Sequence, residues 1–353
     1  MCNTPIDIPM QAPHVMATYA ETHVRAEITP NNPKLAFDLM VPRAWVYSRE
    51  FGPVTQMMFQ AQGLGFFAAS AERGAPVIAV TMTPCPFEVP LDAWARVSAT
   101  HEGWTIIAGQ WFPGPNGPFF DLTSRRQVDG VEFIRRTSVR ADQGKILSVN
   151  CMCARDQWDS VKETFWAAHV TFALVEPTGD PSLEHWVQAS THSPNFQTAH
   201  PASWSAEPAK SDSDQIAGLH LRLSDTKGQT LLAYIVVRAE RASSDGPPVL
   251  AKLVARASRM LAKSSITLKS APKHVPDDQD IRSAAVEGWL GGFTADAHVG
   301  TSDVVVRLGF VERSSVIFTL ALCSPKLEDD VLVALRAQRA FEIVRSGLRT
   351  SAH

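Results

Sequence analysis

Two thiols separated by one residue, Cys151 and Cys153, are the first candidates for chemistry in this chain of 353 residues. Side chains alternate between the two faces of a strand, so both thiols are expected on one face. A zinc site needs further ligands at regular spacing, and none follows here. C-x-C also differs from the C-x-x-C redox motif. The pattern therefore predicts buried structural cysteines and no metal site.

Three histidines, His185, His192 and His200, are the next candidates. They are seven and eight residues apart, without the closer spacing of a metal site, and we interpret them as solvated linker histidines. The sequence contains no Gly-x-Ser-x-Gly elbow, P-loop, G-x-G-x-x-G or H-E-x-x-H motif. We therefore expect no catalytic residues, no cofactor and no enzymatic activity.

A basic stripe is the strongest candidate for a binding surface. The segment after Pro247 and Pro248 predicts a helix with an apolar face that includes Leu250 and Leu261. Its cations recur at steps of four, three and four, which places them opposite that face. Such a stripe could dock an acidic protein or lipid headgroups, although solvated helix faces are also normally charged. The expected partner-binding residues are Lys252, Arg256, Arg259 and Lys263.

A tryptophan, Trp166, is the second predicted contact residue. The sequence predicts a helix whose buried stripe runs from Trp158 through Phe165 to Phe172. Trp166 lies off that stripe, which predicts an exposed aromatic side chain. Exposed aromatics often anchor protein interfaces. We therefore expect Trp166 to contact a partner protein.

Composition limits the class of protein. The chain is 45% hydrophobic and 20% charged, as globular proteins are, and its net charge of −3 gives no general attraction to nucleic acid. It has no run of 18 apolar residues, so no integral membrane segment is expected. The N-terminus lacks the pattern of a secretory signal. Five scattered cysteines favour a reducing cytoplasm, where we expect the protein to be located.

A repeated stretch indicates how the chain is organised. The pattern F-x4-P-x2-W runs from Phe37 to Trp45 and again from Phe196 to Trp204, 159 residues later. A proline ends a strand, and the tryptophan beyond it can close one end of a core. Two such openings predict two similar domains. The expected division is an extended N-terminal arm over 1–33, a first domain over 34–175, a linker over 176–190 and a second domain over 191–349.

Each predicted domain has the order β-β-β-α-β-β-β-β-α. Short turns between strands favour a mainly antiparallel sheet flanked by two helices, which is the α+β class. Residues 131–140 and 145–153 predict a hairpin. Its first strand is expected to bury Phe133 with Arg135 and to carry Arg136 and Arg140 on a wetter face.

The opening pattern, the order of elements and the tryptophan-rich final helix resemble the PsbP-like superfamily. That group includes the extrinsic P protein of photosystem II, the Ran-release factor Mog and the Eag-type chaperones of type VI secretion effectors. The resemblance covers both halves of the chain as a tandem pair. It implies a PsbP-like fold and a non-enzymatic protein that binds other proteins.

These observations favour a protein-binding adaptor, chaperone or assembly subunit linked to a bacterial secretion system. Its partner would be another protein, either a secreted effector or an assembly component. The sequence leaves one alternative open: a small-molecule-binding protein or hydrolase with a pocket between the two domains, a kind of place where ligands often bind.

Overall fold

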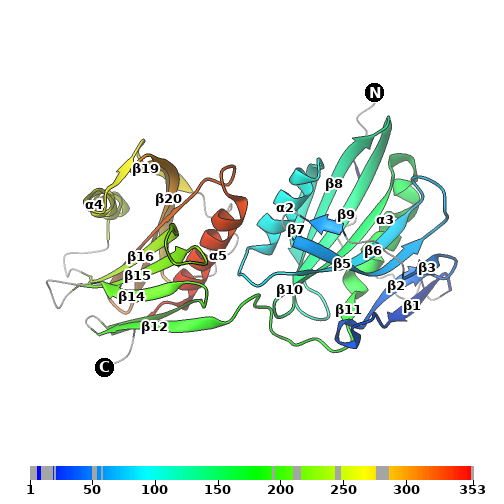
Figure 1. Cartoon of the computed structure of the whole chain (residues 1–353), viewed down its shortest axis with the longest axis horizontal. Coiled ribbons are helices and arrows are strands. Elements are labelled where there is room, and N and C mark those ends of the chain that lie inside the picture. Colours follow the sequence, from blue (N-terminus) through cyan, green and yellow to red (C-terminus); the bar gives the residue numbers. More distant parts are fainter. Residues whose placement is uncertain are drawn as a thin grey trace. The chain divides into compact units, whose positions relative to one another are not determined.

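A computed structural model gives the fold of the chain (Figure 1). It describes residues 6–8, 19, 21–49, 54–56, 59–192, 195–209, 216–242, 248–275 and 286–350. About half of the expected N-terminal arm lies outside the described residues, while residues 23–28 form a strand. The chain divides into two compact units, one of residues 1–86 and 91–183, the other of residues 87–90 and 184–353.

In its described residues, the first unit contains a small sheet, a large sheet and the two helices α2 and α3. The small sheet has the order β1-β2-β11, and the path of the large sheet is β3-β5-β6-β10-β9-β8-β7, with β4 beside β5. All these pairs are antiparallel. The elements are β1 (His23–Ile28), β2 (Phe37–Pro42), β3 (Val46–Ser48), β4 (Val54–Gln56), β5 (Phe59–Ala68), β6 (Val77–Pro84), α2 (Leu91–His101), β7 (Thr105–Phe112), β8 (Phe119–Val128), β9 (Val131–Ala141), β10 (Lys145–Ala154), α3 (Trp158–Thr171) and β11 (Ala173–Leu174).

The second unit has the same strand order. Its small sheet is β12-β13-β22, and the path of its large sheet is β14-β15-β16-β21-β20-β19-β17, with β18 beside β19. The elements are β12 (Trp186–His192), β13 (Asn195–Pro201), β14 (Ser205–Ala209), β15 (Ile216–Ser224), β16 (Leu231–Arg241), α4 (Leu250–Lys263), β17 (Ile266–Leu268), β18 (Lys273–Val275), β19 (Trp289–Val299), β20 (Ser302–Arg313), β21 (Val316–Ser324), α5 (Val331–Gly347) and β22 (Arg349–Thr350).

The expected fold class, α+β with one sheet flanked by two helices in each domain, is wrong. The chain is mostly strand, 50% against 21% helix, and forms four sheets in the described residues. The opening strand β2 pairs within a separate small sheet, and α3 packs against that strand as well as against β9 and β10. Strands as short as β3 and β11 carry too few residues to show a period of two in the sequence.

The repeated stretch has the same local structure in both units. Phe37 and Phe196 are fully buried in their respective cores. Pro42 and Pro201 each end a strand, and the carbonyl of each accepts a hydrogen bond from the backbone N–H of the tryptophan three residues later, at 3.1 and 3.0 Å. The F-x4-P-x2-W pattern therefore marks equivalent strands and turns in the two small sheets.

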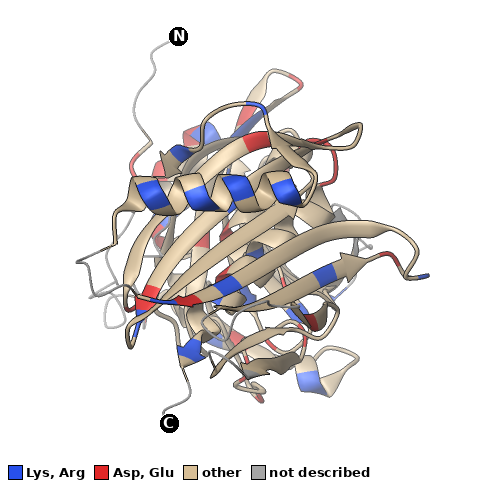
Figure 2. Cartoon of the chain, turned by 90° about the vertical axis from the view of Figure 1, so that its left-hand side faces the viewer, with Lys and Arg blue, Asp and Glu red and all other residues tan. Residues whose placement is uncertain are grey.

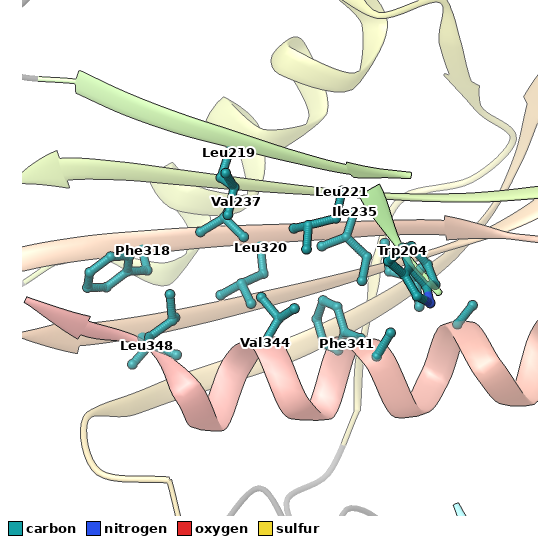
Figure 3. Packing of buried hydrophobic residues seen from close by; sticks show 14 of the residues in the cluster. Trp204, Leu219, Leu221, Ile235, Val237, Phe318, Leu320, Phe341, Val344 and Leu348 are labelled. Atoms are coloured by element: carbon teal, nitrogen blue, oxygen red, sulfur yellow. The ribbon is translucent and has the colours of Figure 1, made fainter. Parts of the chain in front are cut away.

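The large sheet of the second unit is covered on both faces. Leu320 and Phe318 point toward α5 and pack with Phe341 and Val344 (Figure 3). Ala321, directly after Leu320 in sequence, belongs to the cluster under α4. A strand buried on both faces has apolar residues in succession, as β21 does.

The two cysteines that end the last long strands lie on different faces. Cys153 packs in the cluster that contains α3, whereas Cys323 packs in the cluster under α4. The helices α3 and α5 are equivalent by their place in the chain, so Cys153 and Cys323 do not occupy equivalent positions in the two units. An error of one residue in register moves a side chain to the other face of a sheet.

No helix within the described part of the chain is both long enough and apolar enough to cross a membrane.

Candidate functional site

Helix α4 presents the predicted basic stripe to solvent. Leu253, Ala257 and Leu261 are buried on one face of the helix, at 6%, 1% and 2% exposure. The cations recur at helical spacing on the opposite face, and Figure 2 shows them in a row along the helix. The helix α4 contains no Asp or Glu. The structure therefore brings together four exposed cations of the predicted site: Lys252, Arg256, Arg259 and Lys263.

Among the described residues, the charge of this cationic face is largely uncompensated. Arg256 forms an ion pair with Glu240 on β16, and the same carboxylate also pairs with Arg238 at 2.6 Å. Lys252, Arg259 and Lys263 make no ion pair with a described residue. Neighbouring cations at i,i+3 and i,i+4 repel one another, and the three such pairs together cost the helix about 1 kcal/mol.

A substitution at the first cation tests this cost. Lys252→Glu is expected to raise the unfolding free energy of the second unit by about 0.5–1 kcal/mol. It exchanges a repulsion with Arg256 for an attraction and places a carboxylate in the first turn of α4. Urea-dependent alkylation of the buried Cys323 thiol, located by mass spectrometry, measures this unit alone. Lys273→Glu, on β18, is the control and should leave the alkylation curve unchanged. A lower stability for Lys252→Glu would contradict this view of the helix.

A groove of about 770 Å³ begins where α4 ends. Ser264 and Ile266 line it directly after the last cation of the stripe, and Val304 and Cys323 line it from the large sheet. Leu231 and Val299 also line it and are exposed at 56% and 39%. The groove therefore places apolar side chains, mixed with polar ones such as Asp303, beside the end of the cationic face of α4.

The polar groups of the groove do not form a reactive centre. Tyr234 is hydrogen-bonded to His220, and burial lowers the pKa of that histidine and raises the pKa of the tyrosine. Burial also raises the pKa of the Cys323 thiol to about 11. A neutral thiol is a poor nucleophile. Arg222, paired with Glu207 at 3.3 Å, adds a half-exposed cation. These groups are suited to binding.

A thiol, an imidazole and a carboxylate lie in line within the first unit. His169 on α3 is hydrogen-bonded through Nε2 to Cys151 Sγ at 3.2 Å and through Nδ1 to Asp121 Oδ1 at 2.9 Å. Arg136 donates to the same carboxylate from Nε at 3.0 Å and from Nη2 at 2.9 Å. The order of groups resembles a Cys-His-Asp triad.

These side chains form a buried ionic cluster of Asp121, Arg136, Cys151 and His169. The cluster lacks the properties of an active triad. Its side chains are at most 3% exposed, so a substrate cannot reach the thiol. Burial raises the pKa of Cys151 well above its usual value and lowers the pKa of His169. Both changes favour neutral groups, whereas a nucleophilic cysteine needs a thiolate. The cluster is therefore part of the core.

The structure contradicts two predictions about side chains in the first unit. Arg136 and Arg140 were expected on a wetter face, yet they are 0% and 3% exposed. Trp166 was expected to be an exposed contact residue, and this is wrong because it is 1% exposed. The Arg136 guanidinium lies over its ring, 4.4 Å from the centroid. Trp166 faces the large sheet, while other residues of α3 contact β2, so the helix is buried on more than one side.

The three histidines are not brought together as a metal site. His185 is exposed, and His200 is buried with its Nδ1 2.9 Å from the Pro201 carbonyl oxygen. The side chain of His192 lies outside the described residues. Within the described ranges, no group of three or more His, Cys, Asp or Glu side chains could hold a metal ion.

No protein-family model and no curated protein matches the sequence. Solved structures similar to the chain include PsbP from the cyanobacterium Synechocystis, with 18% identity over 43% of this chain and 92% of that chain, at a TM-score of 0.33. The Ran-binding protein Mog1p of Saccharomyces cerevisiae matches with 10% identity over 47% and 96%, at 0.31. The T6SS immunity protein TplEi of Pseudomonas aeruginosa matches with 10% identity over 93% and 97%, at 0.23.

Proposed function

We propose that this chain is a non-enzymatic protein that binds another protein through the cationic face of α4. One observation carries the proposal: four exposed cations line one helix that contains no acidic residue. A helix face that serves only for solubility usually carries charges of both signs, which attract one another at i,i+4. A row of like charges that destabilises its own helix is typical of a binding site, where function is favoured over stability.

The proposal extends to the kind of partner. We propose an adaptor or chaperone that binds a secreted effector or an assembly component of a bacterial secretion system. The resemblance of the sequence to the PsbP-like superfamily supports this assignment. The buried ionic cluster and the groove, with their neutral thiols, give no support to a catalytic role.

Capture of the partner tests the proposed function. The tagged full chain is crosslinked in a native lysate, and a partner is expected to be recovered at about equimolar amount. A bait with Lys252→Glu and Arg259→Glu should recover about one tenth as much, because opposite charges across an interface accelerate association and like charges slow it. Both substitutions replace repulsion within α4 by attraction, so the bait should remain folded.

A second bait controls for charge. Lys34→Glu and Lys273→Glu change the net charge by the same amount at exposed positions outside α4. This bait should recover the same partner as the unmodified chain. Equal recovery by all three baits, or no stoichiometric partner for any of them, would refute the proposed function.

A further inference from the structure

We propose that the partner presents an acidic helix to α4 and places an apolar side chain from the end of that helix in the adjoining groove. The inference rests on the proposed function and adds the chemistry of the partner. It joins two features of the second unit that are continuous in space. The cationic face of α4 ends at Lys263, and the next residue, Ser264, lines the groove.

The spacing of the cations favours a helix as the partner element. At a rise of 1.5 Å per residue, steps of four, three and four residues separate the cations by about 6, 4.5 and 6 Å along the axis. Carboxylates at the same steps on a second helix would match this row. On one face of an extended strand, carboxylates recur every ~6.7 Å. Four such carboxylates would span a length about 3–4 Å greater than that of the row of cations.

The groove supplies the apolar part of the surface. Leu231 and Val299 are exposed at 56% and 39%, and both line the groove. Its volume of about 770 Å³ has room for more than one side chain. Apolar side chains that gather at a concave surface beside charged groups are typical of protein contacts. An apolar residue just beyond the acidic helix would enter this groove.

The geometry favours a protein over a membrane or a nucleic acid. A helix that binds a membrane inserts its apolar face between lipids. That face of α4 is already buried, with Leu253, Ala257 and Leu261 at most 6% exposed. Single-stranded nucleic acids stack their bases on aromatic rings. Among the described residues that line the groove, Tyr234 is the one aromatic, and it is only partly exposed and is hydrogen-bonded to His220.

Synthetic peptides test the inference on the full chain. The probe is a fluorescent alanine-based helix with four glutamates at steps of four, three and four, followed by two leucines. A second peptide has the same composition with the glutamates distributed around the helix, and a third has alanines in place of the leucines. Fluorescence anisotropy at low salt should show the first peptide binding about tenfold more tightly than the second.

Two variants assign the contacts. Lys252→Glu with Arg259→Glu should reduce binding of the first peptide to the level of the second. Leu231→Ser with Val299→Ser should weaken the first peptide severalfold and leave the third unchanged. The inference would be overturned if the first two peptides bound within about twofold of each other. Tighter binding to phosphatidylserine vesicles or to a single-stranded oligonucleotide than to the first peptide would also overturn it.

The outcome is separable from that of the proposed function. If the captured protein depends on Lys252 and Arg259 but the acidic helix does not bind, the partner chemistry is wrong and the proposed function stands. If capture does not depend on these residues, the proposed function itself fails.

Discussion

Arg136→Met is expected to lower the unfolding free energy of the first unit by about 3–5 kcal/mol. The substitution leaves the carboxylate of Asp121 in the core beside His169, without its guanidinium partner. Burial acts to raise the pKa of Asp121, but Arg136 and His169 outweigh it and hold that pKa below its usual value. Without the guanidinium, the carboxylate must either remain charged without its counter-ion or take up a proton, and both destabilise the folded state.

The buried cysteines provide the measurement. Urea-dependent alkylation of Cys153 reports on the first unit, and alkylation of Cys323 reports on the second. Arg136→Met should shift the curve for Cys153 to lower urea and leave the curve for Cys323 in place.

Two further variants test the cause of the effect. Arg125→Met removes an exposed cation 3.7 Å from Glu132 and should cost at most about 1 kcal/mol. Asp121→Leu combined with Arg136→Met should recover much of the loss, because no unpaired buried charge remains. If Arg136→Met cost no more than Arg125→Met, the buried ionic cluster would not stabilise the fold as described.

Phe37→Ala and Phe196→Ala should each destabilise one unit by about 3–5 kcal/mol. Each removes a fully buried ring from the first strand of the repeated pattern. Phe37 packs beside Phe172, with ring centroids 5.6 Å apart, and Phe196 beside Phe318 at 5.4 Å. The loss of transfer free energy and the cavity left behind both contribute.

The expected labelling patterns are reciprocal. Phe37→Ala should expose Cys153 at lower urea with little change at Cys323, and Phe196→Ala should do the reverse. Val46→Ala is the control for the first unit, since Val46 is 67% exposed and should cost little. Small effects at Phe37 or Phe196 would show that the pattern does not mark an essential part of each core.

Features with strong local signals were predictable from the sequence. The helices α3 and α4 follow from their apolar periodicity, and the hairpin of β9 and β10 follows from the turn between Ala141 and Lys145. The cations of α4 were recognised because helical spacing fixes which residues share a face. These features depend only on residues close together in the chain.

Features that depend on distant residues were missed. The predicted order included four strands between the two helices of a domain, but the residues of β8 were not located, since Asp121, Arg125 and Arg126 interrupt its apolar residues. Asp121 is buried because Arg136, fifteen residues later, pairs with it. Trp166 was assigned to the surface because the sequence does not show that α3 contacts both sheets. Burial of charged residues becomes predictable only when their partners are known.

The groove beside α4 was also missed. Its lining comes from several separate segments, including the ends of β15, β16, β20 and β21, which are far apart in sequence. Leu231 and Val299 follow or precede turns, where isolated apolar residues carry no periodic signal. The helix alone could be identified from the sequence, but its apolar neighbour could not.

The central claim is that the exposed cations of α4 contact the partner protein. Its most direct test is the Kd of the purified complex, measured for the unmodified chain, for Lys252→Glu with Arg259→Glu, and for Lys34→Glu with Lys273→Glu. We predict that the α4 variant binds at least about tenfold more weakly and that the control variant binds within about twofold of the unmodified chain. Equal affinities for all three chains would contradict the claim.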